Sequence, residues 1–301
     1  MDKKSIIVIV IITLLIIGWF PLVNKIWPPK PVPVQTNMVS SVTNQITNIA
    51  ATTQTTSAPE LPSPKEVTAL PLPAGVEEKL EVVETDQLRY VFSSLGGGIK
   101  RVDLKHYPHI VDKSKKFVTN NIAKLNDKAP LPVFTIIGEK IALGDGVFTL
   151  KREGNVVIAE KELTNGLRII KGFKPESNYL MRVEVRFENA SGQSLILPPQ
   201  LFVSGTATPM GPFDNETMLG FYYNDGGKVQ RQLASAFMGG GCSVRSPLTH
   251  YESKPGNILW SAAHNQFFAI AVMTHEPARQ LYVSRVELPL PTDEEKEQYQ
   301  R

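Results

Sequence analysis

The stretch Tyr179-Leu-Met-Arg-Val-Glu-Val-Arg-Phe187 alternates apolar and charged side chains from Met181 onward. Successive side chains of a β-strand point to opposite faces of the sheet, so this alternation is typical of a half-buried strand. Arg182, Glu184 and Arg186 would face solvent. The opposite, apolar face is expected to consist of Tyr179, Met181, Val183, Val185 and Phe187.

The same strand pattern recurs along the chain from about residue 75. Leu88, Tyr90 and Phe92 repeat the alternation, and further strands are expected at residues 99–104, 147–150, 155–159, 167–171 and 281–286. Turn sequences rich in glycine, asparagine and aspartate separate these runs, and Asn165-Gly166 is the clearest hairpin signal. Many short strands with frequent turns predict an all-β fold, a large antiparallel sandwich over residues 75–301. Helical periodicity is expected only at residues 292–299.

The amino terminus carries a long apolar segment. Residues 5–27 supply about 20 mostly apolar residues, enough to cross the hydrocarbon core of a bilayer. No small-residue cleavage site follows, so we expect an uncleaved transmembrane anchor and not a signal peptide. Residues 1–4 are placed on the cytoplasmic side because a large domain follows the span. Anchor residues at the start and at the aromatic far end are Ile6, Trp19, Phe20 and Trp27.

Residues 28–74 differ sharply in composition from the segments on either side. Proline clusters open and close this stretch, and threonine, asparagine, glutamine and serine fill its middle. Such a sequence cannot bury enough apolar surface to offset the entropy of its chain. It predicts a flexible linker that holds the β-domain away from the bilayer.

Charge and cysteine content argue against several classes of protein. The formal net charge is only +3 in 301 residues, and the one short basic cluster, residues 113–116, is interpreted as a solvated loop. We therefore expect no nucleic-acid partner. The single cysteine, Cys242, excludes an internal disulfide framework and is interpreted as a small packed residue.

Several segments, in this order, resemble the periplasmic domain of the bacterial YidC family of membrane protein insertases. Residues 84–107 resemble that family's opening hairpin, with a Gly-Gly turn and a closing Leu-x-x-Tyr. Residues 167–195 and the Trp-to-Phe-Phe-Ala segment at residues 260–269 resemble two later signatures. The signature positions, expected to be structural, are Gly96, Gly97, Leu104, Tyr107, Tyr179, Asn189, Trp260, Phe267 and Phe268.

The resemblance implies a β-super-sandwich in the periplasm, anchored in the cell inner membrane. It also implies a non-catalytic docking or substrate-handling role in inserting and folding inner-membrane proteins. The implied partners are the lipid bilayer, components of the Sec translocon and nascent membrane proteins. Family members continue into a five-helix membrane region that carries insertion, and this sequence contains no second hydrophobic span. We therefore expect the chain to be a fragment whose β-domain is truncated at its C-terminal end.

The chain shows no convincing constellation for catalysis, cofactor binding or metal binding. Pro108 argues against a helix that would place His106 and His109 on one face, and no cysteine pair or carboxylate cluster completes a ligand set. The triple glycines at residues 96–98 and 239–241 lack the Lys-Ser/Thr of a phosphate-binding loop. Turns and close backbone approaches explain them better. We expect no enzymatic activity, no cofactor and no metal.

Two other functions stay open on the sequence. The chain could be a stand-alone, membrane-tethered envelope scaffold that offers exposed strands to partners. Alternatively, a carbohydrate-binding sandwich could place carboxylates near aromatic rings. For that second alternative, an irregular loop whose aromatics seal the sandwich is the simpler interpretation. Its candidate residues are Asp214, Glu216 and Asp225 with Phe213, Phe221, Tyr222 and Tyr223.

Overall fold

The alternating stretch forms β9 (Met181–Asn189), the edge strand of a four-stranded antiparallel sheet with the order β6-β7-β8-β9. The other strands are β6 (Thr149–Glu153), β7 (Val156–Glu162) and β8 (Leu167–Pro175). The predicted hairpin at Asn165-Gly166 connects β7 and β8, with Gly166 at a φ of 79°. A non-glycine residue would be strained there, which is why the turn needs glycine.

A second four-stranded sheet contains the predicted opening hairpin. Its order is β1 (Leu80–Glu84), β2 (Leu88–Ser93), β3 (Gly98–Leu104) and β4 (Ala123–Leu125), all antiparallel. Gly96 and Gly97 make the turn between β2 and β3, with φ values of 76° and 56°.

The C-terminal part of the domain forms a third four-stranded sheet and most of two small ones. The third sheet has the order β12 (Val229–Leu233), β11 (Gly220–Asn224), β14 (Ile258–His264) and β15 (Ala269–Ala278). The small sheets pair β10 (Leu201–Phe202) with β5 (Ile136–Ile137), and β13 (His250–Glu252) with β16 (Tyr282–Ser284). The sequence pattern predicts no strand at the positions of nine of these elements, which are β1, β4, β5 and β10 to β15.

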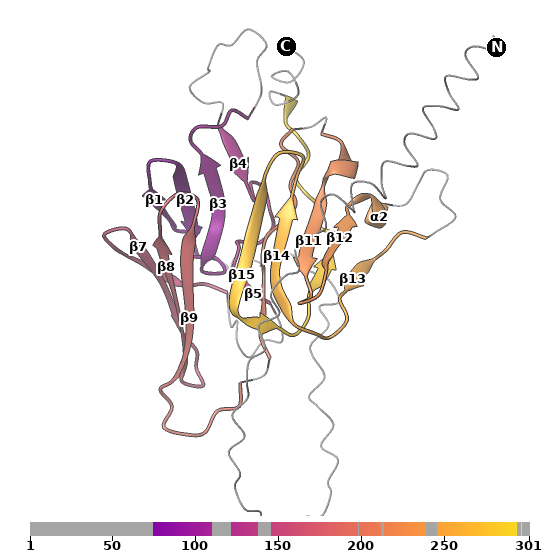
Figure 1. Ribbon diagram of the computed structural model, residues 1–301. Coiled ribbons are helices and arrows are strands. Elements are labelled where there is room, and N and C mark those ends of the chain that lie inside the picture. The colour runs from indigo at the N-terminus through magenta and orange to yellow at the C-terminus, as the bar shows by residue number, and fades with distance from the viewer. Residues whose placement is uncertain are drawn as a thin grey trace, which may run out of the picture. The chain divides into compact units, whose positions relative to one another are not determined.

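This computed structural model describes residues 75–109, 122–137, 146–197, 199–211, 214–238, 246–293 and 296, which all belong to one compact unit, residues 59–301. The named helical elements in these residues are short, the 3-10 helix η1 (Glu216–Met218) and α2 (Ser235–Met238). All strand pairs are antiparallel, which confirms the predicted all-β class. Figure 1 shows the first two sheets side by side and the third sheet next to them.

The main core lies between the first two sheets. Phe92 of β2 and Phe173 of β8 bring their ring centroids to 5.1 Å, and both side chains are fully buried. Apolar residues of β15, including Ile270 and Val272, pack against the same core from the third sheet. Burial of such side chains stabilises the fold by roughly 1.5–3 kcal/mol each. The three sheets therefore share one hydrophobic core.

A smaller core joins the third sheet to the β13–β16 pair. Phe221 and Tyr223 of β11 are buried there together with Phe237 and Ile258. Tyr251 of β13 packs against them and its hydroxyl shares a 2.6 Å hydrogen bond with that of Tyr223. Alternation along β11 places Phe221 and Tyr223 inside and Tyr222 on the other face. The interpretation of this segment as an irregular loop is therefore wrong, although its aromatics do seal the fold.

Several predictions fall on residues outside those that the structure describes. They include the linker at residues 28–74, Cys242, the glycines at 239–241, Phe213 and the anchor residues Ile6, Trp19, Phe20 and Trp27. Most of the helix expected at residues 292–299 lies there too. Within the described residues, no helix has both the length and the hydropathy needed to span a membrane.

Candidate functional site: an apolar cavity beside a free sheet edge

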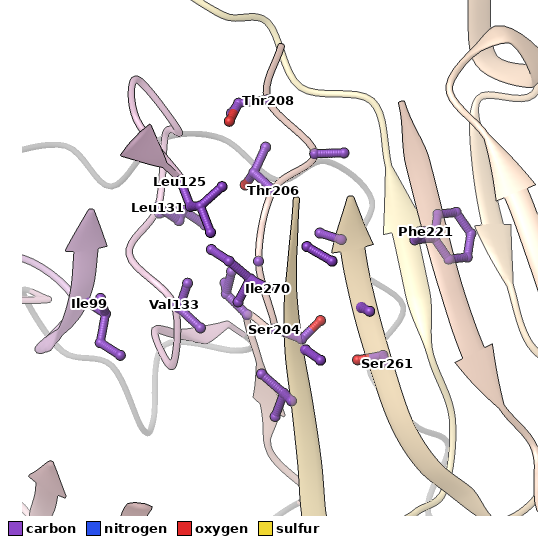
Figure 2. A pocket seen from close by; sticks show the side chains of 18 of the residues that line it. Ile99, Leu125, Leu131, Val133, Ser204, Thr206, Thr208, Phe221, Ser261 and Ile270 are labelled. Carbon is purple, nitrogen blue, oxygen red and sulfur yellow. The ribbon is translucent and has the colours of Figure 1, made fainter. Parts of the chain in front are cut away.

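A cavity of about 1830 Å³ lies between the sheets. Most of its lining is apolar and comes from β2, β3, β9, β14, β15 and the segment 200–211. Figure 2 shows Ile99 and Val133 on one side of this space, and Ile270 and Ser261 on the other. Pockets for small ligands measure roughly 300–1,000 Å³, so this cavity has room for a longer, apolar ligand.

Three aromatic rings form a cluster on the rim of the cavity. The Tyr107 ring centroid lies 6.4 Å from that of Tyr179 and 5.3 Å from that of Phe268. Both tyrosines are partly exposed, and all three residues line the cavity. A hydrogen bond between the tyrosine hydroxyls raises the pKa of Tyr179. The neighbouring Phe267 ring contacts Phe268 and is 61% exposed. The aromatic cluster therefore presents apolar surface at an entrance to the cavity.

One side of the cavity ends at β15, which is an edge strand. On one side β15 pairs with β14 from Ala269 to Met273. On its other side no strand pairs with it among the described residues. Ile270 and Val272 pack toward the core, whereas Met273 on the outer face is 78% exposed. The first half of β15 thus offers an unpaired backbone next to an apolar cavity.

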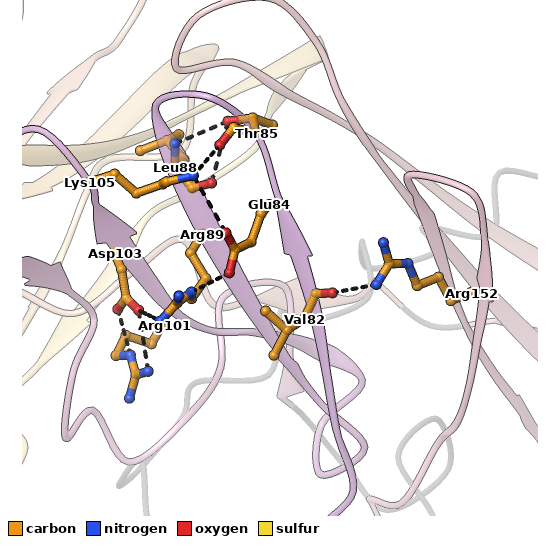
Figure 3. Close-up of polar contacts among 9 residues, drawn as sticks. All are labelled: Val82, Glu84, Thr85, Leu88, Arg89, Arg101, Asp103, Lys105 and Arg152. Carbon is orange, nitrogen blue, oxygen red and sulfur yellow. Dashed lines mark hydrogen bonds and ion pairs between the residues drawn. The ribbon is translucent and has the colours of Figure 1, made fainter.

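Two other edge strands carry features that discourage pairing. The outer face of β9 presents Arg182, Glu184 and Arg186, all exposed. On β1, the Arg152 guanidinium donates a 2.8 Å hydrogen bond to the Val82 carbonyl oxygen, which occupies that acceptor (Figure 3). Charged side chains and covered backbone groups are the usual protection of sheet edges. Residues Ala269–Met273 have no charged side chain, and no side chain of the described residues bonds to their backbone.

A polar network lies on the sheet of strands β1 to β4. Arg89 pairs with Glu84 at 2.7 Å, and Arg101 pairs with the buried carboxylate of Asp103 at the same distance (Figure 3). Lys105 adds a contact to Glu84. Such a network favours the sheet's register and contains no free acid or base next to the cavity. We assign it a structural role.

The remaining family-signature residues have structural positions. A methyl group on Gly96 or Gly97 would overlap Thr135 or Phe148, so both glycines allow close packing. Leu104 is buried in the main core, and Trp260 of β14 lines the cavity. The Asn189 side chain holds the turn after β9 through Ser191 and Gln193. The structure therefore brings Leu104, Tyr107, Tyr179, Trp260, Phe267 and Phe268 to the cavity and places Gly96, Gly97 and Asn189 in turns.

The main core also contains a buried cation, Lys171 of β8. Its ammonium donates to the carbonyl oxygens of Gly96 at 2.7 Å and Phe134 at 2.9 Å, and it lies 4.3 Å from the Phe148 ring centroid. Burial, with a smaller effect from the charge of Lys161, lowers the pKa of this ammonium to about 7. Lys171 does not line the cavity, and its two hydrogen bonds connect β8 to the Gly-Gly turn and to Phe134.

The described candidate residues of the carbohydrate-binding alternative do not form a common site. Asp214 accepts a hydrogen bond from the Met210 backbone N–H, and Asp225 accepts two from the backbone of the β11–β12 turn. These backbone bonds lower the pKa of Asp225. Asp214 precedes β11 and Asp225 follows it, so the two carboxylates serve separate turns. The Tyr222 ring stacks on that of His264, with 4.7 Å between the ring centroids.

The histidines do not converge either. Within the described residues, no group of three or more His, Cys, Asp or Glu side chains could hold a metal ion. His106 contacts the Asp86 carbonyl oxygen, and His264 contacts that of Asn265. Each therefore serves a local turn.

Sequence reasoning missed the free edge of β15 and the burial of Lys171. The signal for the first is the uncharged run Ala269–Met273, which lacks the charges that β9 carries at every second position. The signal for the second is a lysine inside the apolar run 167–173.

Comparison with protein families gives a match to the YidC periplasmic domain over residues 81–299. This range includes every strand except the first residue of β1. It therefore contains the cavity, the aromatic cluster and β15.

Curated relatives carry the same name. The membrane protein insertase YidC of Prosthecochloris aestuarii is 25% identical over 301 residues, covering 94% of this chain and 48% of the relative. That of Oleidesulfovibrio alaskensis is 27% identical over 234 residues, covering 73% of this chain and 41% of the relative. The chain thus spans about half the length of the relatives it matches.

Proposed function

Because the chain belongs to the YidC periplasmic domain family, we propose that it is the periplasmic part of an inner-membrane protein insertase, with a non-catalytic role in handling client proteins. The observation that carries this proposal is the apolar cavity with the aromatic cluster on its rim. Clients of such a machine expose apolar segments before they enter the bilayer. Contact with a cavity of this size removes that apolar surface from water.

The whole-protein setting is part of the same proposal. The predicted anchor at residues 5–27 tethers the domain to the inner membrane, and the predicted linker at 28–74 sets its reach. Components of the Sec translocon and nascent membrane proteins are the proposed partners. Insertion itself belongs to the part of the longer relatives that this chain does not cover.

Site-specific photo-crosslinking tests the proposal. A benzoylphenylalanine replaces Phe267, which is exposed beside the aromatic cluster, in the protein as the cell makes it. A matched probe replaces Ile196, which is 92% exposed but does not line the cavity. We expect newly made membrane proteins to crosslink at position 267 and not at position 196. Equal crosslinking at both positions, or none at 267, would overturn client handling at this site.

A further inference from the structure

We propose that Tyr107 and Tyr179 form an oxidative modification site, at which a one-electron oxidant derived from a peroxide couples the two rings into a dityrosine. Tyr107 follows β3 and Tyr179 precedes β9. The new carbon–carbon bond would therefore join the sheet of strands β1 to β4 to the sheet of strands β6 to β9. This inference goes beyond client handling and does not depend on it.

The geometry of the tyrosine pair is the first support. The two ring centroids lie 6.4 Å apart, and the ring planes make an angle of 58°. The two hydroxyl groups are hydrogen-bonded to each other, so a phenol has an oxygen beside it that can accept its proton when an electron leaves. Two groups that the fold holds in contact react at a far higher effective concentration than groups on separate molecules. Coupling within one chain is therefore favoured.

The coupling balances with one molecule of hydrogen peroxide. Each tyrosine gives up one electron and its hydroxyl proton and becomes a phenoxyl radical. The unpaired electron is shared with the ring carbons next to the one that bears the oxygen, and one such carbon from each ring forms the new bond. Each of these carbons then loses its hydrogen as a proton to the oxygen of its own ring, which restores two phenols. The peroxide takes up the two electrons and two protons and becomes two water molecules.

The freedom of both rings to move is the second support. Ring carbons in contact at about 3.5 Å have to approach to a bond length of about 1.5 Å, so at least one ring must turn. Tyr107 is 41% exposed and Tyr179 is 49% exposed, which leaves room for that turn.

A second tyrosine pair provides a comparison within the same domain. The ring centroids of Tyr223 and Tyr251 lie 6.2 Å apart and their hydroxyls share a hydrogen bond, so this pair has nearly the same geometry. Tyr223 is buried, however, and both rings pack in the smaller core. Close packing resists the movement that coupling requires. We therefore expect the pair at positions 107 and 179 to couple and the buried pair to remain unlinked.

The bond would have a measurable effect on stability. It would fix two points that lie about 70 residues apart in the chain, which lowers the entropy of the unfolded state as a disulfide does. The single cysteine of this sequence cannot form such a link within the chain. The denaturant concentration at the midpoint of unfolding should therefore be higher for the crosslinked protein.

Photo-oxidation of the full natural protein tests this inference. The oxidant is a light-activated ruthenium complex with persulfate, a peroxide that takes up the electrons. Dityrosine fluorescence and mass spectrometry of the linked peptides report the product. We expect one main linked pair, between positions 107 and 179.

Three conservative variants sharpen the test. Tyr107→Phe and Tyr179→Phe keep a ring at each position, so the fold should persist, but each should remove this linked pair and most of the fluorescence. Tyr282→Phe is the matched control, because the Tyr282 hydroxyl donates to the Gln280 side-chain oxygen, and it should leave the yield unchanged.

Three outcomes would overturn the proposal. The linked pair at positions 107 and 179 could be absent although other tyrosines are oxidised. The buried pair at positions 223 and 251 could couple with an equal yield, which would mean that exposure does not select the site. In a mixture of isotope-labelled and unlabelled protein, the links could join labelled to unlabelled peptides, which would show coupling between molecules.

Discussion

At the residue scale, Lys171 is the least ordinary member of the core. A buried ammonium is unfavourable unless it is well paired. Here two carbonyl oxygens and the face of Phe148 receive it. One of these carbonyls belongs to Phe134, which has a φ of 69°. The lysine therefore links β8 to two backbone segments that lack regular pairing.

The folded protein should become more stable as pH rises above about 7, through the contribution of Lys171. The pKa of Lys171 is about 7 in the folded protein and 10.5 for an unperturbed lysine, so between these pH values the unfolded chain binds more protons. Below pH 7 Lys171 is protonated in both the folded and the unfolded state. Burial of its charge then lowers the free energy of unfolding by the full amount, on the order of 5 kcal/mol at most. The carbonyl contacts reduce it.

Denaturant unfolding of the protein and of Lys171→Met, from pH 6 to about pH 10, measures this contribution. In the variant, the free energy of unfolding should no longer rise with pH through this contribution, because methionine does not titrate. If the free energy of unfolding of Lys171→Met rises with pH as steeply as that of the unchanged protein, other groups cause the pH dependence.

The Gly-Gly turn offers a matched pair of glycines. Gly97→Ala combines a positive φ with overlap of the new methyl group and the Phe148 ring. Gly154→Ala has a similar φ of 61° but no atom within 4 Å. Strain alone costs about 1–2 kcal/mol, and overpacking adds roughly 1–3 kcal/mol. We expect Gly97→Ala to lower the free energy of unfolding by about 3 kcal/mol or more. If both variants lose a similar free energy of unfolding, the Phe148 ring moves to accommodate the new methyl group.

At the element scale, the side chain of Asn126 connects three segments of the chain. Its amide nitrogen donates to the carbonyl oxygens of Lys100 at 3.1 Å and Leu131 at 3.3 Å, and its side-chain oxygen accepts from the Thr206 backbone N–H at 3.0 Å. The residue is buried and has a φ of 58°. It thus holds β3, the loop after β4 and the segment that leads from β10.

We expect Asn126→Ala to lower the free energy of unfolding by about 3 kcal/mol or more, because buried carbonyl and N–H groups lose their partner. Asn178→Ala is the matched control, since Asn178 has a φ of 61° but is exposed. Chemical denaturation measures both. If the two variants lose equal stability, backbone strain and not the hydrogen bonds explains the effect at position 126.

At the scale of the whole molecule, the three main sheets meet around one cavity, and its lining comes from segments distant in sequence. Tyr107 follows β3, Tyr179 precedes β9 and Phe268 precedes β15, yet their rings are in contact. The aromatic cluster forms because these three strand ends lie at the same end of the domain.

The size of the natural protein tests the whole-molecule proposal. The chain has a mass of 33.3 kDa and covers about half of each relative. Five further membrane helices with their loops would add at least roughly 15 kDa. On an immunoblot of source membranes with an antibody against residues 75–290, we expect a band heavier by that amount. A band at the mass of the chain itself would favour the tethered scaffold instead.

The sequence by itself determined part of the strand pattern and the family. Alternation with period two at residues 88–92 and 181–187, and glycines at tight turns, are local properties, because each depends only on neighbouring backbone geometry. They predicted β2, β3, β7, β8 and β9 closely. Among the strands they missed is β11, where three consecutive aromatic residues hide the alternation between the buried and the outer face.

Only the tertiary structure decided which residues make the candidate site. Whether Lys171 is buried, whether Tyr107 contacts Phe268 and whether β15 has one neighbour or two all depend on how sheets pack. Packing joins residues that are far apart in the sequence, and no local period encodes such contacts. A strand at an edge and a strand inside a sheet have the same backbone geometry, so their difference becomes visible only when the neighbouring strands are in place.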